Sequence, residues 1–203
     1  MKIKILLFFF IITVSFSFSQ LNTSKFLVSG KTSLGHSNLG FYGNYGFSFE
    51  RIFNKRIGAV YNLEGISRKN NFGLHAPMGI AGGPILFAAG IANEVDKDTS
   101  TSGTFGIIGG LLLFILPDGI TYHHNIGYYW DVSPYANLLG LEFEFNDQHK
   151  LDALKYACSF GIKTSYLLKD NVFCFGYIET RKTGGYPWGL GVGMGISMSF
   201  GKN

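Results

Sequence analysis

The segment Gly185–Asn203 constrains the fold of this chain more than any other. From Trp188 to Gly201, every second residue is large and apolar, and the residues between them are glycine or serine. Successive side chains of a β-strand point to opposite faces, so the segment predicts a strand with one apolar face and one nearly bare face. A dinucleotide-binding loop would instead need G-x-G-x-x-G spacing between a strand and a helix. The strict period of two favours the strand.

The same alternation recurs along the chain. It is found at residues 44–50, 57–64, 139–145, 154–168 and 172–178. In each segment, acidic, lysine or small residues lie opposite a large apolar face, and in the last segment Phe173, Phe175 and Tyr177 form that face. Turn-forming residues separate the segments. They lie at Asn54-Lys55, Ser67–Asn71, Pro117–Gly119, Asp131–Pro134, Asn146–Asp152, Lys169–Asn171 and Thr180–Pro187. Strands of about 10 to 15 residues are long enough to cross a bilayer at the usual tilt.

Residues 1–19 have the pattern of a secretory signal peptide. Lys2 and Lys4 precede an apolar core, and Ser17-Phe18-Ser19 forms a small-x-small cleavage site. The formal net charge of +4 falls to +2 when the two lysines are removed with this leader. Such a weakly basic mature chain gives no support to nucleic-acid binding. The remainder, residues 20–203, has the length of a single domain.

The composition indicates an exported membrane protein that crosses the bilayer with strands. The chain has 20 Phe and 11 Tyr, and only 15% of its residues are charged. After the leader, no uninterrupted apolar run has the length of a membrane helix. Hydrophobicity carried in alternation rather than in long runs is typical of a transmembrane β-barrel.

Two stretches, 72–92 and 105–116, are apolar on both faces. Gly82-Gly83-Pro84 interrupts the first, and the polar segment 93–104 links the two as a flexible loop. Period alone does not separate a strand from a helix in short apolar runs. We therefore expect either two further strands or a helical hairpin inside or beside the barrel. The predicted strand count is ten with these stretches and eight without them.

From about residue 25 to residue 201, this pattern resembles the small outer-membrane β-barrel proteins of Gram-negative bacteria. Such barrels often end on an aromatic residue, and here Phe200 is followed by Gly201-Lys202-Asn203. The resemblance implies an all-β fold, a transmembrane antiparallel up-and-down β-barrel of 8–10 strands. It also implies an outer-membrane location, contact with outer-membrane lipid and insertion by the barrel-assembly machinery. Neither a cofactor nor a particular protein partner is indicated.

The alternation predicts a set of charged side chains that point into the lumen. These are Glu50, Glu64, Glu142, Glu144, Lys155 and Lys163. Side chains fill the interior of a barrel of this size, and buried charges must pair because an unpaired charge in a dry site is very costly. We therefore expect an ion-pair network that fills the lumen. A narrow polar channel or a small-ligand cavity is the alternative.

Aromatic residues near the strand ends predict a girdle at the membrane interfaces. They are Tyr128, Tyr129, Trp130, Tyr186 and Trp188. His123 and His124 are neighbours, so their side chains would diverge in a strand, and neither forms metal-ligand spacing with His75 or His149. We expect interfacial or loop histidines and no metal site.

The chain has two cysteines, Cys158 and Cys174. If the hairpin turns at Lys169-Asp170, Cys158 belongs to the aromatic outward face and Cys174 to the small inward face. Residues on opposite faces of a sheet and far out of register do not meet the geometry of a disulfide. We expect two unpaired cysteines.

The leading functional hypothesis is a structural or surface-binding role rather than an enzymatic one. With the C-terminus periplasmic, the turns at 67–71, 117–119, 146–152 and 180–187 would face outward, and Lys169-Asp170 would be a periplasmic turn.

Two alternatives stay open. His36, Ser37 and Glu50 are similar to the His/Ser/Glu arrangement of outer-membrane lipid A deacylases, in which serine attacks an ester, histidine is the base and the acid orients it. The adjacency of His36 and Ser37 departs from that pattern. The other alternative is a soluble secreted barrel that binds an apolar ligand with its large residues turned inward.

Overall fold

The structure of the protein is a computed structural model that describes residues 24–202 except 55, 96–99, 147 and 149. The expected signal peptide, residues 1–19, lies outside the described residues. The elements in chain order are β1 (Ser24–Ser37), β2 (Gly40–Phe53), β3 (Ile57–Arg68), β4 (Phe72–Pro77), α2 (Met78–Val95), α3 (Ser100–Phe114), β5 (Gly119–Tyr122), β6 (His124–Ile126), β7 (Trp130–Phe145), β8 (Leu151–Lys169), β9 (Val172–Thr183) and β10 (Gly189–Lys202).

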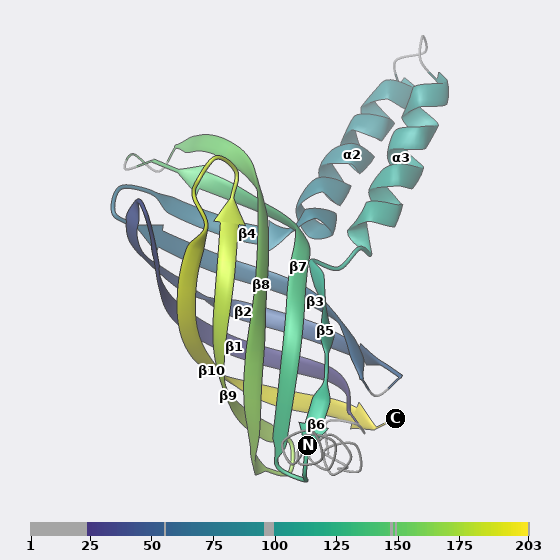
Figure 1. Ribbon diagram of the computed structural model, residues 1–203. Helices are drawn as coiled ribbons and strands as arrows, with labels where there is room; N and C mark the ends of the chain where they lie inside the picture. Colours follow the sequence, from purple (N-terminus) through teal and green to yellow (C-terminus); the bar gives the residue numbers. More distant parts are fainter. Residues whose placement is uncertain (1–23, 55, 96–99, 147, 149, 203) are drawn as a thin grey trace, which may run out of the picture.

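The strands form one antiparallel sheet whose pairings return to their starting point (Figure 1). β1 pairs with β2 on one side and with β10 on the other, and β2 pairs with β3. β4, β5 and β6 pair in succession with residues 145–140, 137–135 and 132–130 of β7, so these three short strands share one position. The ten strands therefore occupy eight positions around the sheet, and the predicted up-and-down barrel of 8–10 strands is confirmed.

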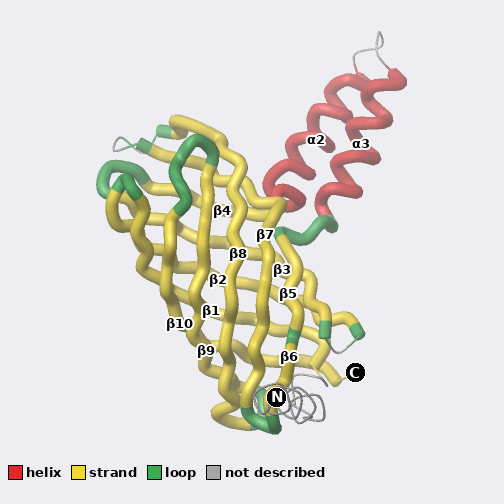
Figure 2. Tube along the Cα trace, in the orientation of Figure 1, coloured by secondary structure: helices red, strands yellow, loops and turns green. Residues whose placement is uncertain are grey.

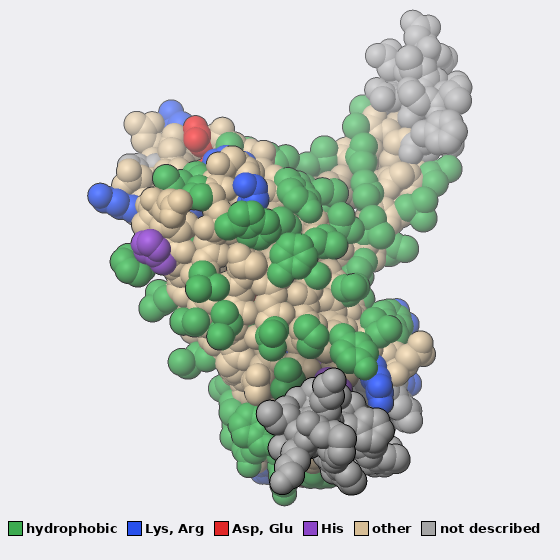
Figure 3. Space-filling view, viewed as in Figure 1, with side chains coloured by type: hydrophobic (Ala, Val, Ile, Leu, Met, Phe, Trp, Pro, Cys, Tyr) green, Lys and Arg blue, Asp and Glu red, His purple; other side chains and the backbone are tan. Residues whose placement is uncertain are grey.

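Large side chains point away from the barrel, and small or polar ones point inward. On β10, Val192, Met194 and Ile196 are 58%, 67% and 57% exposed, whereas Ser197 and Ser199 are buried. Hydrophobic side chains cover the barrel face seen in Figure 3, and charged side chains lie near its two ends. An apolar outer band of this kind is the lipid-facing surface of a transmembrane barrel. The soluble alternative needed the large residues inside and is therefore wrong.

One strand departs from the expected orientation. On β9, Phe173, Phe175 and Tyr177 are buried inside the barrel instead of facing outward. Their place is explained by the neighbouring strand, because Tyr177 lies beside Gly193 and Phe175 beside Gly195 in the β9–β10 register. The bare inner face of β10 leaves the room that these rings fill, an arrangement also used deliberately in designed sheets.

This inversion also corrects the predicted position of Cys174. It pairs with the outward-facing Tyr166 and therefore shares the outer face with Cys158, whose register partner is Lys182. Both cysteines are free. The prediction of two unpaired cysteines is confirmed, but the reason is their separation along the sheet and not their placement on opposite faces.

Residues 72–77 of the first apolar stretch form β4, and the rest of the two stretches forms most of a helical hairpin outside the barrel (Figure 2). The expected loop at 93–104 is wrong for residues 93–95 and 100–104, which belong to α2 and α3. Figure 2 shows α2 and α3 side by side, leaving the wall between β4 and β5. α2 continues through Pro84, so the expected interruption by Gly82-Gly83-Pro84 is wrong. Within the described parts of the chain, no helix combines the length and the apolar character needed to span a membrane.

Two expected turns are also corrected. Pro117–Gly119 is the base of the hairpin within the wall, where Asp118 is fully buried. Asp131–Pro134 lies inside β7, and the chain turns instead at residues 127–129. The connections at 38–39, 69–71 and 184–188 gather at one end of the barrel, which we call the loop end (Figure 2), together with the described residues 146, 148 and 150. The shorter turns at 127–129 and 170–171 lie at the opposite end, which we call the turn end (Figure 2), together with residues 54 and 56 and the end of β10.

Candidate functional site

The inward strand faces bring the six charges singled out in the sequence into the lumen. Four of them are buried carboxylates: Glu50, Glu64, Glu142 and Glu144. Lys155 pairs with Glu144, and Lys163 Nζ lies 3.4 Å from Glu50 Oε2. Glu64 and Glu142 have other partners, which sequence reasoning did not assign.

Glu64 is the centre of the middle layer of the lumen. Lys31 Nζ lies 2.5 Å from Glu64 Oε1, and Arg181 Nη1 lies 2.5 Å from Glu64 Oε2. Both cations are largely removed from water. The sequence held a signal for Lys31, because it has the same position in the alternation as the small inward residues Ser29 and Ser33. The partnership itself depends on strand register, which the alternation does not reveal.

The layer nearest the loop end is built around two carboxylates of β7. Arg68 donates through both terminal nitrogens to Glu142, and the Thr183 hydroxyl donates to Glu142 Oε2 at 2.8 Å. Glu144 accepts hydrogen bonds from Lys155 and from the Tyr186 hydroxyl. Each carboxylate is thus paired and hydrogen-bonded, which is what burial of a charge requires.

The layer nearest the turn end centres on His123. Its Nε2 lies 2.7 Å from Glu50 Oε1 and its Nδ1 lies 2.9 Å from Asp131 Oδ2, and the ring is 1% exposed. Ser133 also contacts Nδ1, at 3.2 Å. The expectation of an interfacial or loop histidine is therefore wrong for His123, and it is also wrong for His75, which is buried in β4. Both ring nitrogens face carboxylates, so the arrangement differs from a catalytic triad, where serine bonds the nitrogen opposite the acid.

Between this layer and the turn end, the lumen contains an apolar cluster. Leu27, Ile52, Leu167 and Phe173 pack together in the interior, each 5% exposed or less. Three layers of charged side chains and this apolar cluster therefore follow one another along the lumen, and a small cavity of about 40 Å³ lies among Lys31, Glu50 and Lys163.

Asp118 connects the strand position shared by β4, β5 and β6 to the neighbouring strands of the wall. Its backbone nitrogen donates to Val60 O at 2.7 Å, and its backbone oxygen accepts from the nitrogens of Leu138 and Leu139. Its side chain accepts from Asn62 at 2.6 Å and contacts His75 Nε2 at 3.1 Å. The β7 register shifts between Asn137 and Gly140, directly opposite this residue. The wall therefore stays hydrogen-bonded across the point where the hairpin leaves.

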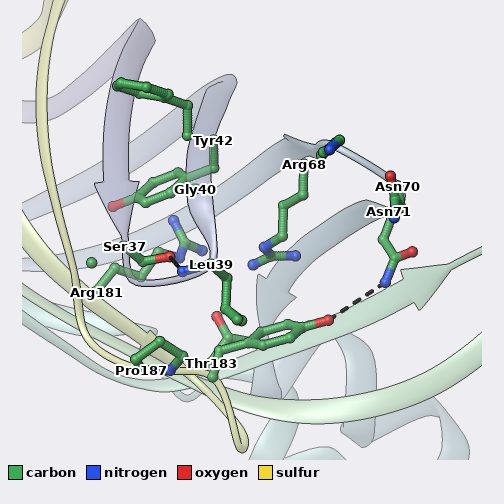
Figure 4. Close-up of a pocket in the computed structure, with 14 residues that line it drawn as sticks. Ser37, Leu39, Gly40, Tyr42, Arg68, Asn70, Asn71, Arg181, Thr183 and Pro187 are labelled. Carbon is green, nitrogen blue, oxygen red and sulfur yellow. Dashed lines mark hydrogen bonds between the residues drawn. The ribbon is translucent and has the colours of Figure 1, made fainter.

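A cavity of about 240 Å³ lies at the loop end, above the charged layers. Figure 4 shows the side chains of Tyr42, Arg68 and Arg181 turned into it from β2, β3 and β9. The rest of its lining is Ser37, Leu39, Gly40, Phe41, Lys69, Asn70, Asn71, Thr183, Tyr186, Pro187 and Gly189.

Two polar atoms at this cavity are buried without a partner among the described residues: the Tyr42 hydroxyl and Arg181 Nε. Tyr42 is 8% exposed and Arg181 is 6% exposed. Buried polar atoms are normally hydrogen-bonded, because leaving one unsatisfied costs about 1 to 3 kcal/mol. The cavity therefore offers a donor pair of hydroxyl and guanidinium to a ligand or to water.

The five aromatic residues expected in the girdle fall into two groups. Tyr128, Tyr129, Trp130 and Trp188 are about half exposed, the first three at the turn end and the last near the loop end. Tyr186 differs: its hydroxyl donates to Glu144, and Lys155 Nζ lies 4.0 Å from its ring centroid. This tyrosine covers the charged layer at the cavity.

The structure does not bring together the residues of the proposed hydrolase arrangement. His36 is on the outer face near the loop end and packs against Phe41, whereas Glu50 is buried at the other end of β2 beside Leu27. Ser37 Oγ accepts from Leu39 N at 3.2 Å. Among the described residues, no group of three His, Cys, Asp or Glu side chains is placed to hold a metal ion.

No protein-family profile matches the chain, and no curated protein sequence matches it. Solved structures with a similar fold were found. Neisserial surface protein A is 12% identical, with 88% of this chain and 99% of that chain covered and a TM-score of 0.52. The outer membrane protein OprG from Pseudomonas aeruginosa is 8% identical, with 91% and 100% covered and a TM-score of 0.47.

The likeness to Neisserial surface protein A shows the fold, which is that of a small outer-membrane β-barrel. The outer-membrane location and the transmembrane character expected from the sequence agree with this fold and with the exposed apolar band.

Proposed function

We propose that this protein is an integral outer-membrane barrel that binds a small anionic ligand at its loop end. The single observation that carries the proposal is the cavity where Tyr42 and Arg181 present unpartnered buried donors beside Arg68 and Lys69. Surface binding is one of the two roles expected from the sequence. Such a barrel implies two partners, outer-membrane lipid around the apolar band and the barrel-assembly machinery. Cleavage after residue 19 would remove the signal peptide during export.

The charge around the cavity favours an anion. Arg68, Lys69 and Arg181 line it, and no acidic side chain is among its lining residues. Glu142 lies beneath the cavity, but Arg68 and Thr183 already satisfy its oxygens. A carboxylate or phosphate oxygen would accept from both Arg181 Nε and the Tyr42 hydroxyl, and such charge-assisted bonds are stronger than neutral ones. The cavity volume admits a small group and not a macromolecule.

Binding at the surface, rather than transport, is supported by the side chains that lie along the lumen. The charged layers and the apolar cluster of Leu27, Ile52, Leu167 and Phe173 lie in series between the cavity and the turn end. A solute that entered the cavity would have to separate buried ion pairs to move further, and breaking such a pair costs several kcal/mol. We therefore place the ligand in the cavity. We propose that the lumen beneath the cavity is closed.

The test uses inorganic phosphate as a probe for the protein in nanodiscs at constant ionic strength. We expect saturable nuclear magnetic resonance shifts at the Gly40 and Gly189 amides and at the Arg181 side-chain nitrogen. Tyr42→Phe removes one unpartnered donor and keeps the ring. Loss of a hydrogen bond to a charged ligand should weaken binding by roughly tenfold or more.

Tyr45→Phe is the matched control, because Tyr45 lies on the same strand but faces outward and is 55% exposed. It should bind phosphate as the wild type does. Shifts that do not saturate, or equal affinities in wild type and Tyr42→Phe, would contradict the proposal.

A further inference from the structure

The helical hairpin has a surface that a water-exposed hairpin would not carry. Ile85 and Leu86 on α2 are 58% and 41% exposed, Leu111 and Leu112 on α3 are 58% and 60% exposed, and Ile115 directly after α3 is 66% exposed. Residues 78–92 and 105–116 contain no charged side chain. Large apolar surfaces are rare on soluble proteins and mark contact with a protein or a membrane.

The two helices pack together as helices do in a membrane. Gly79 and Gly83 are four residues apart on α2, and Gly106 and Gly110 are four residues apart on α3. A Cβ atom at Gly106 would lie 2.9 Å from Gly90 Cα, and one at Gly110 would lie 2.7 Å from Gly83 O. Small residues spaced in this way allow the close backbone contact that holds membrane helices together.

Burial within the hairpin follows this seam. Of its described residues, Gly79, Gly83, Gly90 and Gly110 are buried, and the apolar residues on the other sides are exposed or half-buried. A protein partner would require one preferred face. Apolar exposure around the whole circumference instead fits a surrounding hydrocarbon phase.

The position of the base places the hairpin at membrane depth. The chain leaves the wall opposite Leu138 and Leu139, near the middle of β7. Seven residues separate Leu138 from Phe145 at the loop end, or about 16 Å of height for a strand at the usual tilt. The apolar band of such barrels is about 25 Å tall, so the base lies well inside it.

The direction of the hairpin agrees with a position inside the membrane. Figure 1 shows α2 and α3 rising from the wall toward the loop end. The 18 residues of α2 span about 27 Å, which exceeds the remaining height to the membrane surface. The far ends of the two helices, residues 93–95 of α2 and 100–104 of α3, are mostly polar in sequence, as helix ends near the aqueous interface would be.

From these observations we infer that the α2–α3 hairpin is an intramembrane element, embedded in the leaflet at the loop end with lipid acyl chains as the occupant of its apolar surface. It continues the lipid-facing band of the barrel. This inference does not depend on ligand binding in the cavity.

Spin labels on single cysteines test it in phospholipid nanodiscs. Cys158→Ser and Cys174→Ser provide the background, Ile85→Cys and Leu112→Cys place one label on each helix, and each variant's folding is checked by heat-dependent migration. Collisions with oxygen report hydrocarbon, and collisions with a water-soluble nickel chelate report water. Val192→Cys, on the apolar band, is the membrane control, and Asn70→Cys, in an exposed loop, is the aqueous control.

We expect the labels at Ile85 and Leu112 to match Val192, with high oxygen and low nickel accessibility. Nickel accessibility at either position equal to that at Asn70 would overturn the inference. The Val192 label reports separately on barrel insertion, so a failure of the hairpin inference is distinguishable from a failure of the barrel itself.

Discussion

At the scale of single residues, glycines on β10 and aromatic rings on β9 form one packing unit. A Cβ atom at Gly195 would collide with the Phe175 ring and with the backbone oxygen of Gly30, and one at Gly193 would meet the Tyr177 ring. The size alternation of the sequence predicted a bare inner face for β10. It failed for β9 because large residues face inward where the neighbouring strand leaves room, and that depends on pairing.

Substitution at Gly195 should be costly for this reason. Gly195→Ala should lower the free energy of unfolding by about 1 to 3 kcal/mol, as overpacking of a filled interior does. Gly30→Ala is the control, since a Cβ atom there meets nothing closer than Phe47 at 3.9 Å, and it should leave stability unchanged or raise it by about 0.5 kcal/mol. Urea unfolding in lipid vesicles, followed by tryptophan fluorescence, measures both. Equal changes in the free energy of unfolding for Gly195→Ala and Gly30→Ala would contradict the packing of β9 rings against β10 glycines.

The buried ion pairs give a second prediction at this scale. Arg181→Leu leaves Glu64 with Lys31 alone and should cost about 3 to 5 kcal/mol of unfolding free energy. Arg51→Leu removes an exposed arginine and should cost less than about 0.5 kcal/mol. The same urea titration compares them, and a cost below 1 kcal/mol for Arg181→Leu would show that the pair is not needed. The sequence located the carboxylate of this pair. Its cation comes from β9, which is not a neighbour of β3 in the sheet, so the pair depends on how the closed barrel brings the two strands to face each other.

At the scale of elements, the notable feature is one strand position divided into β4, β5 and β6 by the helical hairpin. For residues 72–116, the sequence left two structures open, further strands or a helical hairpin. A short apolar run fits the period of a strand as well as that of a helix. What decides between them is the glycine spacing, which lets two helices pack closely, together with Asp118, which closes the wall. The base of the hairpin at Pro117–Gly119 resembles a turn in sequence, and its place inside the wall follows from tertiary pairing.

The barrel should fold without the hairpin. Deletion of residues 78–117 joins Pro77 to Asp118, and the β7 register already accommodates a bulge at Leu138 and Leu139 opposite this point. The remaining residues would continue β4 into β5 as one strand with a β-bulge. Heat-dependent migration on gels should retain the folded form. Recovery of only the unfolded form would mean that the hairpin is part of the folding unit.

At the scale of the whole molecule, the charged layers and the apolar cluster along the lumen predict that the protein does not conduct ions. In planar bilayers, the purified protein should show no stepwise conductance at any moderate voltage, because the three layers and the cluster lie in series. Insertion is verified in parallel by protection from protease. A regular unitary conductance from inserted protein would contradict the closed lumen and favour the narrow-channel alternative.

On every long strand except β9, most of the large apolar side chains meet lipid and the small or charged ones face the barrel axis. Methyl nuclear magnetic resonance in nanodiscs with protonated lipid tests it without any substitution. Cross-peaks to acyl chains should appear for Val192, Met194 and Ile196, which are more than half exposed, and be missing for Leu27, Ile52 and Val60, which are buried. Acyl cross-peaks to the second set and none to the first would contradict the claim.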